Sequence, residues 1–101
     1  MKMWSEKNGD IVKVYYRGDV DEHSAYELRT YLDKLITGGA KSLELSLKYV
    51  DFMDSTGIGM LLGRYKITSK LRIPFSVSDV NSQIDKIFKI SGIYTVIPLA
   101  R

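Results

Sequence analysis

The chain has 101 residues, of which 45% are apolar and 27% charged, and this length and composition predict one folded domain over residues 1–101 rather than a disordered segment. It contains no cysteine, which excludes disulfides, thiolate metal sites and thiol nucleophiles. The net charge of +3 is spread along the chain without a basic block, and no apolar run approaches the roughly 20 residues that span a bilayer, so we expect a cytoplasmic protein with no direct contact to nucleic acid or to a membrane.

Two strands are predicted at the start of the chain. Residues 11–17 are rich in β-branched and aromatic residues, and their valines alternate with polar positions. A weaker strand is expected over residues 3–6. The two are joined through Asn8 and Gly9, a dipeptide that favours a tight hairpin turn, so we expect them to pair antiparallel.

A helix and a further strand follow. Residues 22–36 carry apolar side chains at helical spacing, Asp21 can serve as the N-cap, and Gly38 ends the element. Residues 42–47 then alternate strictly between leucine and polar residues, which predicts a strand buried on one face.

Residues 56–69 form the clearest predicted helix. Arg64 and Lys66 fall outside its apolar stripe and are expected to point away from the core. The stripe consists of Ile58, Leu61, Leu62 and Tyr65.

The last third of the chain predicts a strand, a short helix and another strand. Residues 73–77 alternate, and the proline among them favours a strand near the margin of the sheet. A third helix is expected to be capped by Asn81 or Ser82 and closed by Gly92, before a short strand over residues 94–97.

This order of elements predicts an α/β fold with a mixed sheet of four to five strands. Its crossover connections are expected to be right-handed. Because the strands alternate between apolar and polar residues, we expect the helices to cover mainly one face of the sheet and the other face to stay relatively open.

Residues 51–59 lead from a strand into the second helix and form the candidate functional segment. Asp54 or Ser55 can cap this helix, with a contribution of about 0.5 to 2 kcal/mol, and Gly57 and Gly59 can let the turn pack closely. From the pattern alone, capping is the favoured interpretation, because it is the usual role of such residues at a helix start.

A phosphate-binding loop is the second interpretation of the same segment. Gly57, Gly59 and Gly63 after a strand are similar to the dinucleotide fingerprint, and Asp79 lies about 20 residues further on. The third glycine is one position late, however, and Asp54 places a negative charge where a pyrophosphate would sit. A nucleotide-binding domain therefore stays an alternative.

Three blocks of sequence resemble one protein family. Residues 52–59, Phe-Met-Asp-Ser-Thr-Gly-Ile-Gly, look like the Asp-Ser-Ser/Thr-Gly signature of anti-sigma-factor antagonists, which are single-domain STAS proteins of bacterial sporulation and stress control. Gly-Asp-Val-Asp at residues 18–21 and Ile-Phe-Lys-Ile-Ser-Gly-Ile at residues 87–93 resemble two further family blocks. The blocks occur in the family's order and cover nearly the whole chain, so the resemblance implies a STAS fold.

The resemblance also implies a function. Ser55 would be the phosphoacceptor, and the partner would be an anti-sigma factor that is itself a serine kinase. The unmodified protein would bind this kinase and free the sigma factor, and a phosphatase would remove the phosphate from Ser55. No cofactor is implied. The implied partner-binding residues are Asp21, Asp54, Ser55, Thr56, Gly57, Ile58 and Gly59.

Two of these residues have a second interpretation. Asp21 can be a plain N-cap of the first helix instead of a partner contact. Thr56 is an alternative phosphoacceptor, although its β-branched side chain has less freedom to present the hydroxyl.

The remaining residues suggest few other functions. A STAS module of another signalling or transport assembly is the alternative binding role. No Ser-His-Asp order and no paired carboxylates are visible, so we expect no catalysis, and the single histidine, His23, is expected at the surface rather than in a metal site. Four tyrosines occupy positions typical of packing rather than of base stacking, namely Tyr16, Tyr26, Tyr31 and Tyr65.

Overall fold

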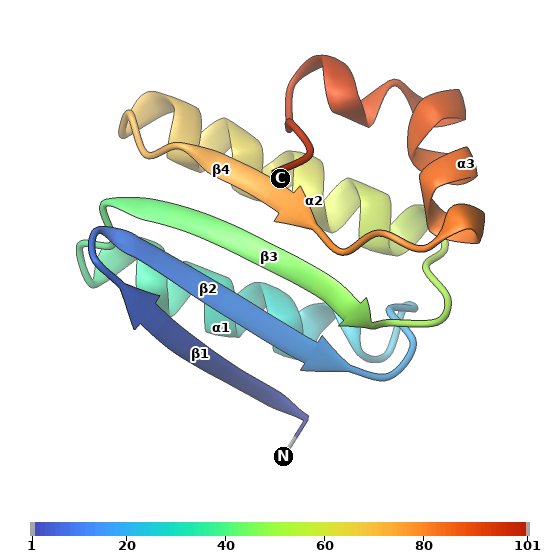
Figure 1. Cartoon of the computed structure of the whole chain (residues 1–101), viewed down its shortest axis with the longest axis horizontal. Helices are drawn as coiled ribbons and strands as arrows, with labels where there is room; N and C mark the ends of the chain where they lie inside the picture. The colour runs from blue at the N-terminus through green and yellow to red at the C-terminus, as the bar shows by residue number, and fades with distance from the viewer. Residues whose placement is uncertain (1, 101) are drawn as a thin grey trace.

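A four-stranded sheet organises the chain in Figure 1, a computed structural model that describes residues 2–100. The strands lie side by side in chain order; the first pair is antiparallel and the other two pairs are parallel. The predicted mixed sheet is thus confirmed, with four strands. They are β1 (Met3–Asn8), β2 (Ile11–Arg17), β3 (Ser42–Tyr49) and β4 (Phe75–Ser78).

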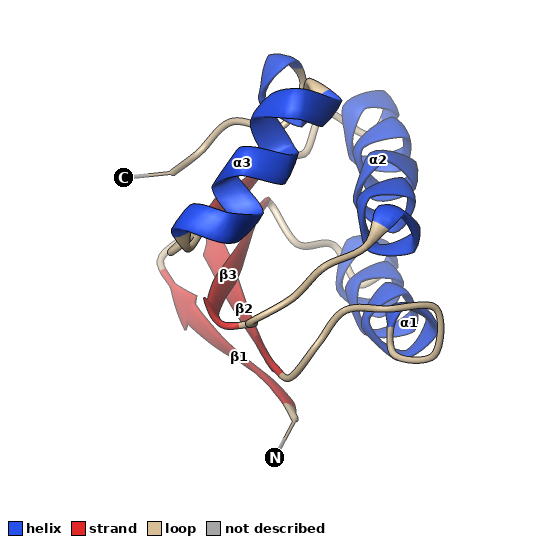
Figure 2. Ribbon diagram, turned by 90° about the vertical axis from the view of Figure 1, so that its right-hand side faces the viewer, coloured by secondary structure: helices blue, strands red, loops and turns tan. Residues whose placement is uncertain are grey.

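Helices cover one face of this sheet. Figure 2 shows α1 (Ala25–Thr37) and α2 (Ser55–Lys70) next to each other on the same side, where they connect the parallel strands. The helix α3 (Ser82–Ser91) follows β4 and leads into a short 3-10 helix, η1 (Ile93–Thr95). None of the helices within residues 2–100 is long and apolar enough to cross a bilayer.

The core lies between the sheet and the two covering helices. The alternation of β3 turns its three leucines toward the helices, where they are fully buried against apolar side chains of α1 and α2. Burial of one such side chain contributes about 1.5 to 3 kcal/mol. The central part of this layer consists of Leu43, Leu45, Leu47, Leu28, Leu32 and Leu61.

Three of the four strands have other boundaries than predicted: β1 and β3 each extend two residues further, and β4 covers residues 75–78 instead of 73–77. Asn8 pairs with Ile11, so the hairpin loop is Gly9 and Asp10 instead of Asn8 and Gly9. Gly9 has a φ of 64° and fills the loop position that needs a left-handed backbone. Pro74 lies just before β4, where a proline removes no ladder N–H and its carbonyl accepts from the N–H of Leu43 at 2.9 Å.

The predicted strand over residues 94–97 is wrong. Gly92 ends α3 with a φ of 76°, and the chain then turns through η1 instead of extending. Ile93 and Ile97 are both buried and are joined by a 2.8 Å hydrogen bond from the Ile97 N–H to the Ile93 carbonyl. Thr95, Val96 and Ile97 are β-branched and typical of a strand, but the spacing of four residues between Ile93 and Ile97 suits a turn. An isolated parallel bridge between Val77 and Leu99 extends the sheet here.

Asp79 holds an unusual backbone conformation at the end of β4. Its φ is 56°, and its carboxylate accepts a 2.7 Å hydrogen bond from the Ser46 hydroxyl of β3. Lys13 Nζ lies 3.7 Å from the same oxygen. The pKa of Asp79 is lowered, chiefly by the Ser46 hydrogen bond and further by Lys13. The bond therefore stabilises the fold while the carboxylate is ionised.

We predict that Ser46→Ala lowers the free energy of unfolding by about 1 kcal/mol at neutral pH and raises the pKa of Asp79 toward its ordinary value. A lowered pKa in the folded state contributes stability above the unfolded-state value of 3.8 and loses it as the pH falls through the folded-state value. Urea denaturation over a pH series and an NMR titration of Asp79 measure both effects. Ser76→Ala on β4 is the control, and a destabilisation by Ser46→Ala that does not shrink in acid would contradict the prediction.

Candidate functional site

The start of α2 lies beside the loop that precedes α1. Val20 and Met53 form an isolated parallel bridge beyond the ends of β2 and β3. The Val20 N–H donates to the Phe52 carbonyl at 2.8 Å, and the Asp54 N–H donates to the Val20 carbonyl at 3.2 Å. The bridge therefore brings Asp21 and Asp54, which are distant in sequence, to the same end of the sheet.

Asp54 is the N-cap of α2. Its Oδ1 accepts from the N–H groups of Thr56 at 2.9 Å and Gly57 at 3.2 Å. The two capping candidates of the sequence are thereby resolved, because Ser55 is the first helical residue and its side chain is exposed. The helix begins one residue earlier than predicted. Because Asp54 provides the cap, the Ser55 hydroxyl is not needed for it and stays exposed.

Gly57 is required by packing. A Cβ at this position would come within 2.5 Å of Met53 Cγ and 3.0 Å of Val20 Cγ1. The absence of a side chain lets the first turn of α2 rest directly on the bridge. Gly57 is buried, whereas Thr56 and Gly59 on the same helix are exposed. Gly57 thus fixes the start of α2 by packing against Val20 and Met53.

Asp21 caps a turn that precedes α1 instead of capping the helix itself. Its Oδ1 accepts from the N–H groups of His23 and Ser24, both at 3.0 Å, and α1 begins at Ala25. These backbone hydrogen bonds, Ser24 first and then His23, lower the pKa of Asp21. The predicted N-cap role and the predicted helix start at residue 22 are wrong. Asp21 remains a half-buried carboxylate on the rim of the site.

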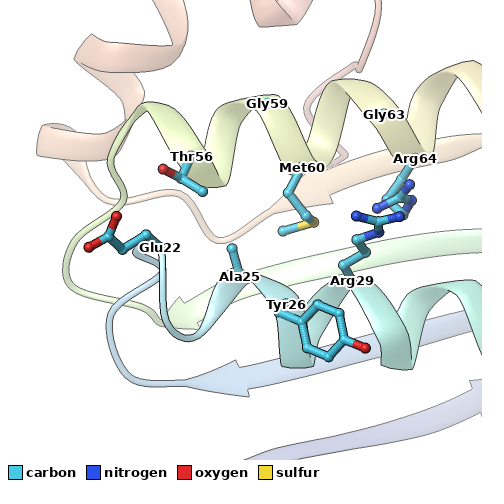
Figure 3. Close-up of a pocket in the computed structure, with 9 residues that line it drawn as sticks. All are labelled: Glu22, Ala25, Tyr26, Arg29, Thr56, Gly59, Met60, Gly63 and Arg64. Carbon is cyan, nitrogen blue, oxygen red and sulfur yellow. The ribbon is translucent and has the colours of Figure 1, made fainter.

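A groove of about 410 Å³ runs from this site along the surface between α1 and α2. Glu22 and Thr56 lie at the end nearest Ser55, and Arg29 and Arg64 lie at the far end (Figure 3). The far end of the groove was not predicted from the sequence, because Arg64 was expected to point away from the core. It is only 6% exposed, and it faces Asp33 of α1.

Tyr26 and His23 are both exposed on the surface. Tyr26 on α1 was expected to pack, but it is 70% exposed and stands on the wall of the groove. His23 is exposed, as predicted. Within residues 2–100 no group of three or more His, Cys, Asp or Glu side chains could hold a metal ion.

The glycines do not form the phosphate cradle of the nucleotide alternative. A pyrophosphate would need the N–H groups of Thr56 and Gly57, and both are bonded to Asp54. Asp79, which would contact the ribose, instead bonds to Ser46 in the sheet. The local geometry therefore disfavours a nucleotide at the start of α2.

The third block of sequence resemblance contributes to the core. Phe88 is fully buried and stacks edge-on against Tyr94 with ring centroids 5.6 Å apart. Gly92 ends α3 in a left-handed conformation. This block maintains the fold, whereas the other two meet at the bridge between Val20 and Met53.

The comparison with known proteins identifies the family. A family model described as STAS domain matches residues 3–101. The chain belongs to the STAS domain family. Over 95 residues this STAS domain is 32% identical to the anti-sigma F factor antagonist of Paenibacillus polymyxa, a match that covers 93% of this chain and 81% of the relative.

Solved structures share the fold of this STAS domain. An anti-sigma factor antagonist from Mycobacterium paratuberculosis superposes with a TM-score of 0.84 at 19% identity, over 96% of this chain and 82% of that one. The Bacillus cell fate determinant SpoIIAA in its phosphorylated form superposes with a TM-score of 0.73 at 23% identity, over 98% and 91%. At sequence identities of 19% and 23%, these similarities show a shared fold.

We predict opposite effects for two glycine substitutions in α2. Gly57→Ala should destabilise the STAS domain by about 1 to 3 kcal/mol, because the new methyl group collides with Met53 and Val20. Gly59→Ala should stabilise it by about 0.5 to 1 kcal/mol, because a Cβ there meets no atom within 4 Å and alanine favours a helix. Urea denaturation measures both, and equal effects would rule out the role assigned to Gly57.

Proposed function

We propose that this STAS domain is an anti-sigma-factor antagonist whose binding to its partner is turned off by phosphorylation of Ser55. The partner is an anti-sigma factor that is also a serine kinase. Binding of the unmodified protein frees the sigma factor, and a phosphatase restores the unmodified state. The observation that carries the proposal is the exposed Ser55 at the first position of α2, next to an aspartate that already caps the helix.

The names of similar proteins support the same role. The Paenibacillus relative is an anti-sigma F factor antagonist, and the structural neighbour from Bacillus was solved in a phosphorylated form. Both match nearly the whole of this chain. A phosphorylated antagonist with the same fold fits a switch that is set by phosphorylation.

The local electrostatics make a phosphate on Ser55 effective. It would add about −1.5 to −2 charges beside the Asp54 carboxylate, which already occupies the N–H groups of Thr56 and Gly57. In the free protein this phosphate stays hydrated at an exposed position. In a complex it loses water and requires cationic groups of the partner. A loss of about 3 kcal/mol of binding energy lowers the affinity roughly a hundredfold.

The accessible residues around Ser55 form the proposed partner surface. Thr56 and Gly59 are exposed, and Asp21, Asp54 and Ile58 are half-buried. Phe52, just before the bridge residue Met53, adds a large apolar side chain that is 41% exposed. A surface of this kind offers an apolar contact beside a hydroxyl, which suits a protein partner better than a small charged ligand.

We predict that incubation with the anti-sigma factor kinase and ATP adds one phosphate to the wild-type chain and none to Ser55→Ala. Thr56→Ala is the matched control and should be modified as wild type. Intact-mass analysis and site mapping give the result. Modification of Ser55→Ala, or its loss in Thr56→Ala alone, would assign the phosphate to another residue.

We further predict that calorimetric titration separates the two states of the switch. Unmodified wild type and Ser55→Ala should bind the kinase with similar affinity, and the phosphorylated protein should bind about a hundredfold more weakly. Ser55→Asp should bind at least about tenfold more weakly, because it carries less charge than a phosphate. Equal binding of all four forms would overturn the proposal, and a partner of another class in a signalling or transport assembly would replace it.

A further inference from the structure

Two arginines share one carboxylate at the far end of the groove between α1 and α2. Arg64 of α2 is buried, and its Nε lies 2.8 Å from Asp33 Oδ1 of α1. The Nε of Arg29 lies 3.8 Å from the other oxygen of the same carboxylate. Figure 3 shows the two guanidinium groups facing one another. The cluster of two cations and one anion therefore has a net positive charge.

The contact between Arg64 and Asp33 is close but poorly aligned. Among residues 2–100, neither Arg64 Nε nor Asp33 Oδ1 has an aligned hydrogen-bond partner, although both atoms are buried and close together. Burial lowers the pKa of Arg64; Asp33 raises it and Arg29 lowers it again. One carboxylate shared by two guanidinium groups leaves one positive charge without a partner, and a further carboxylate would balance it.

Two glycines keep the approach to these arginines open. A Cβ at Gly59 or at Gly63 would meet no atom within 4 Å, so the backbone of α2 is uncovered along the groove. Tyr26 stands on the wall contributed by α1, with 70% of its surface exposed. Aromatic and arginine side chains are the residue types most enriched at the energetic centres of protein interfaces.

The charge along the groove changes sign. Glu22 lies at the end near Thr56 and Ser55, whereas Arg29 and Arg64 lie at the other end, about 12 Å further along α2. The acidic end repels a polyanion laid along the groove, so a nucleic acid is a poor match. A protein that docks at Ser55 and carries one acidic side chain at the right distance matches both ends.

We propose that the groove is a second contact site for the protein partner, in which Arg29 and Arg64 bind an aspartate or glutamate side chain of that partner. The inference rests on the proposed function, because the same partner docks at the Ser55 end. Guanidinium groups bind carboxylates through paired hydrogen bonds, and the flanking Tyr26 would shield that contact from water.

The first test reverses the charge of Arg29, which is exposed enough to be replaced without disturbing the core. Arg29→Glu should weaken binding of the unmodified protein to the anti-sigma factor kinase at least about tenfold in calorimetric titration. Lys66→Glu is the matched control, because Lys66 is exposed on α2 and does not line the groove. It should change the affinity less than about twofold, and the difference between the two variants should shrink as salt is raised.

A second variant fills the groove without changing its charge. Gly63→Leu should fold, because leucine favours a helix and a Cβ at this position would meet no atom within 4 Å. It should nevertheless weaken binding about tenfold by occluding the path to Arg64. Circular dichroism and urea denaturation establish that both variants are folded before binding is compared.

The outcomes separate the two proposals. If Arg29→Glu and Gly63→Leu bind as wild type while phosphorylation of Ser55 still abolishes binding, the groove site is wrong and the proposed function stands. If both variants bind weakly and Lys66→Glu does not, the groove site is supported. If wild type does not bind the kinase in either phosphorylation state, the proposed function is overturned, together with the groove site that depends on it.

Discussion

The parallel bridge between Val20 and Met53 is the contact on which the site depends. Because β2 and β3 are adjacent and parallel, the segments that leave their C-terminal ends run side by side, and the bridge continues that pairing beyond the sheet. Gly57 then lets α2 begin directly on top of it. The position of Ser55 is therefore set by the buried residues Val20, Met53 and Gly57.

The cap formed by Asp54 makes the start of α2 independent of the Ser55 hydroxyl. Asp54 satisfies the N–H groups of Thr56 and Gly57, so the helix does not need the Ser55 hydroxyl. Under the proposed function, a phosphate on Ser55 adds charge without removing a cap. The helix can then begin at the same residue in both states, and the two states differ in the free energy of binding rather than in fold.

Local sequence patterns predicted most of the helices and strands but few of the contacts between them. Alternating leucines identified β3, and the segment from Asp54 to Gly59 identified the start of α2, because both signals lie within a few consecutive residues. The role of Asp21 depends on its hydrogen bonds with His23 and Ser24, which compete with those of a helix cap and form a separate turn.

The burial of Arg64 could not be predicted from its own helix. The predicted stripe of Ile58, Leu61, Leu62 and Tyr65 is displaced, because the face that α2 buries carries Gly57, Met60, Leu61, Arg64 and Thr68. The ionic partner of Arg64, Asp33, belongs to another helix. The same limit applies to Ile93 and Ile97, whose β-branched side chains are typical of a strand. Their place in a turn follows from Gly92, which ends α3, and from the core that both isoleucines enter. Tertiary packing overrides local preference at both places.

The change of charge along the groove would fix the orientation in which a partner docks. A partner with a cation opposite Glu22 and an acid opposite the arginine pair fits in one direction only, because the reversed orientation brings like charges together at both ends. In the favoured direction the Ser55 hydroxyl occupies one fixed place against the partner. Under the proposed function that partner is also the kinase, so the orientation that strengthens binding would also present the hydroxyl for phosphorylation.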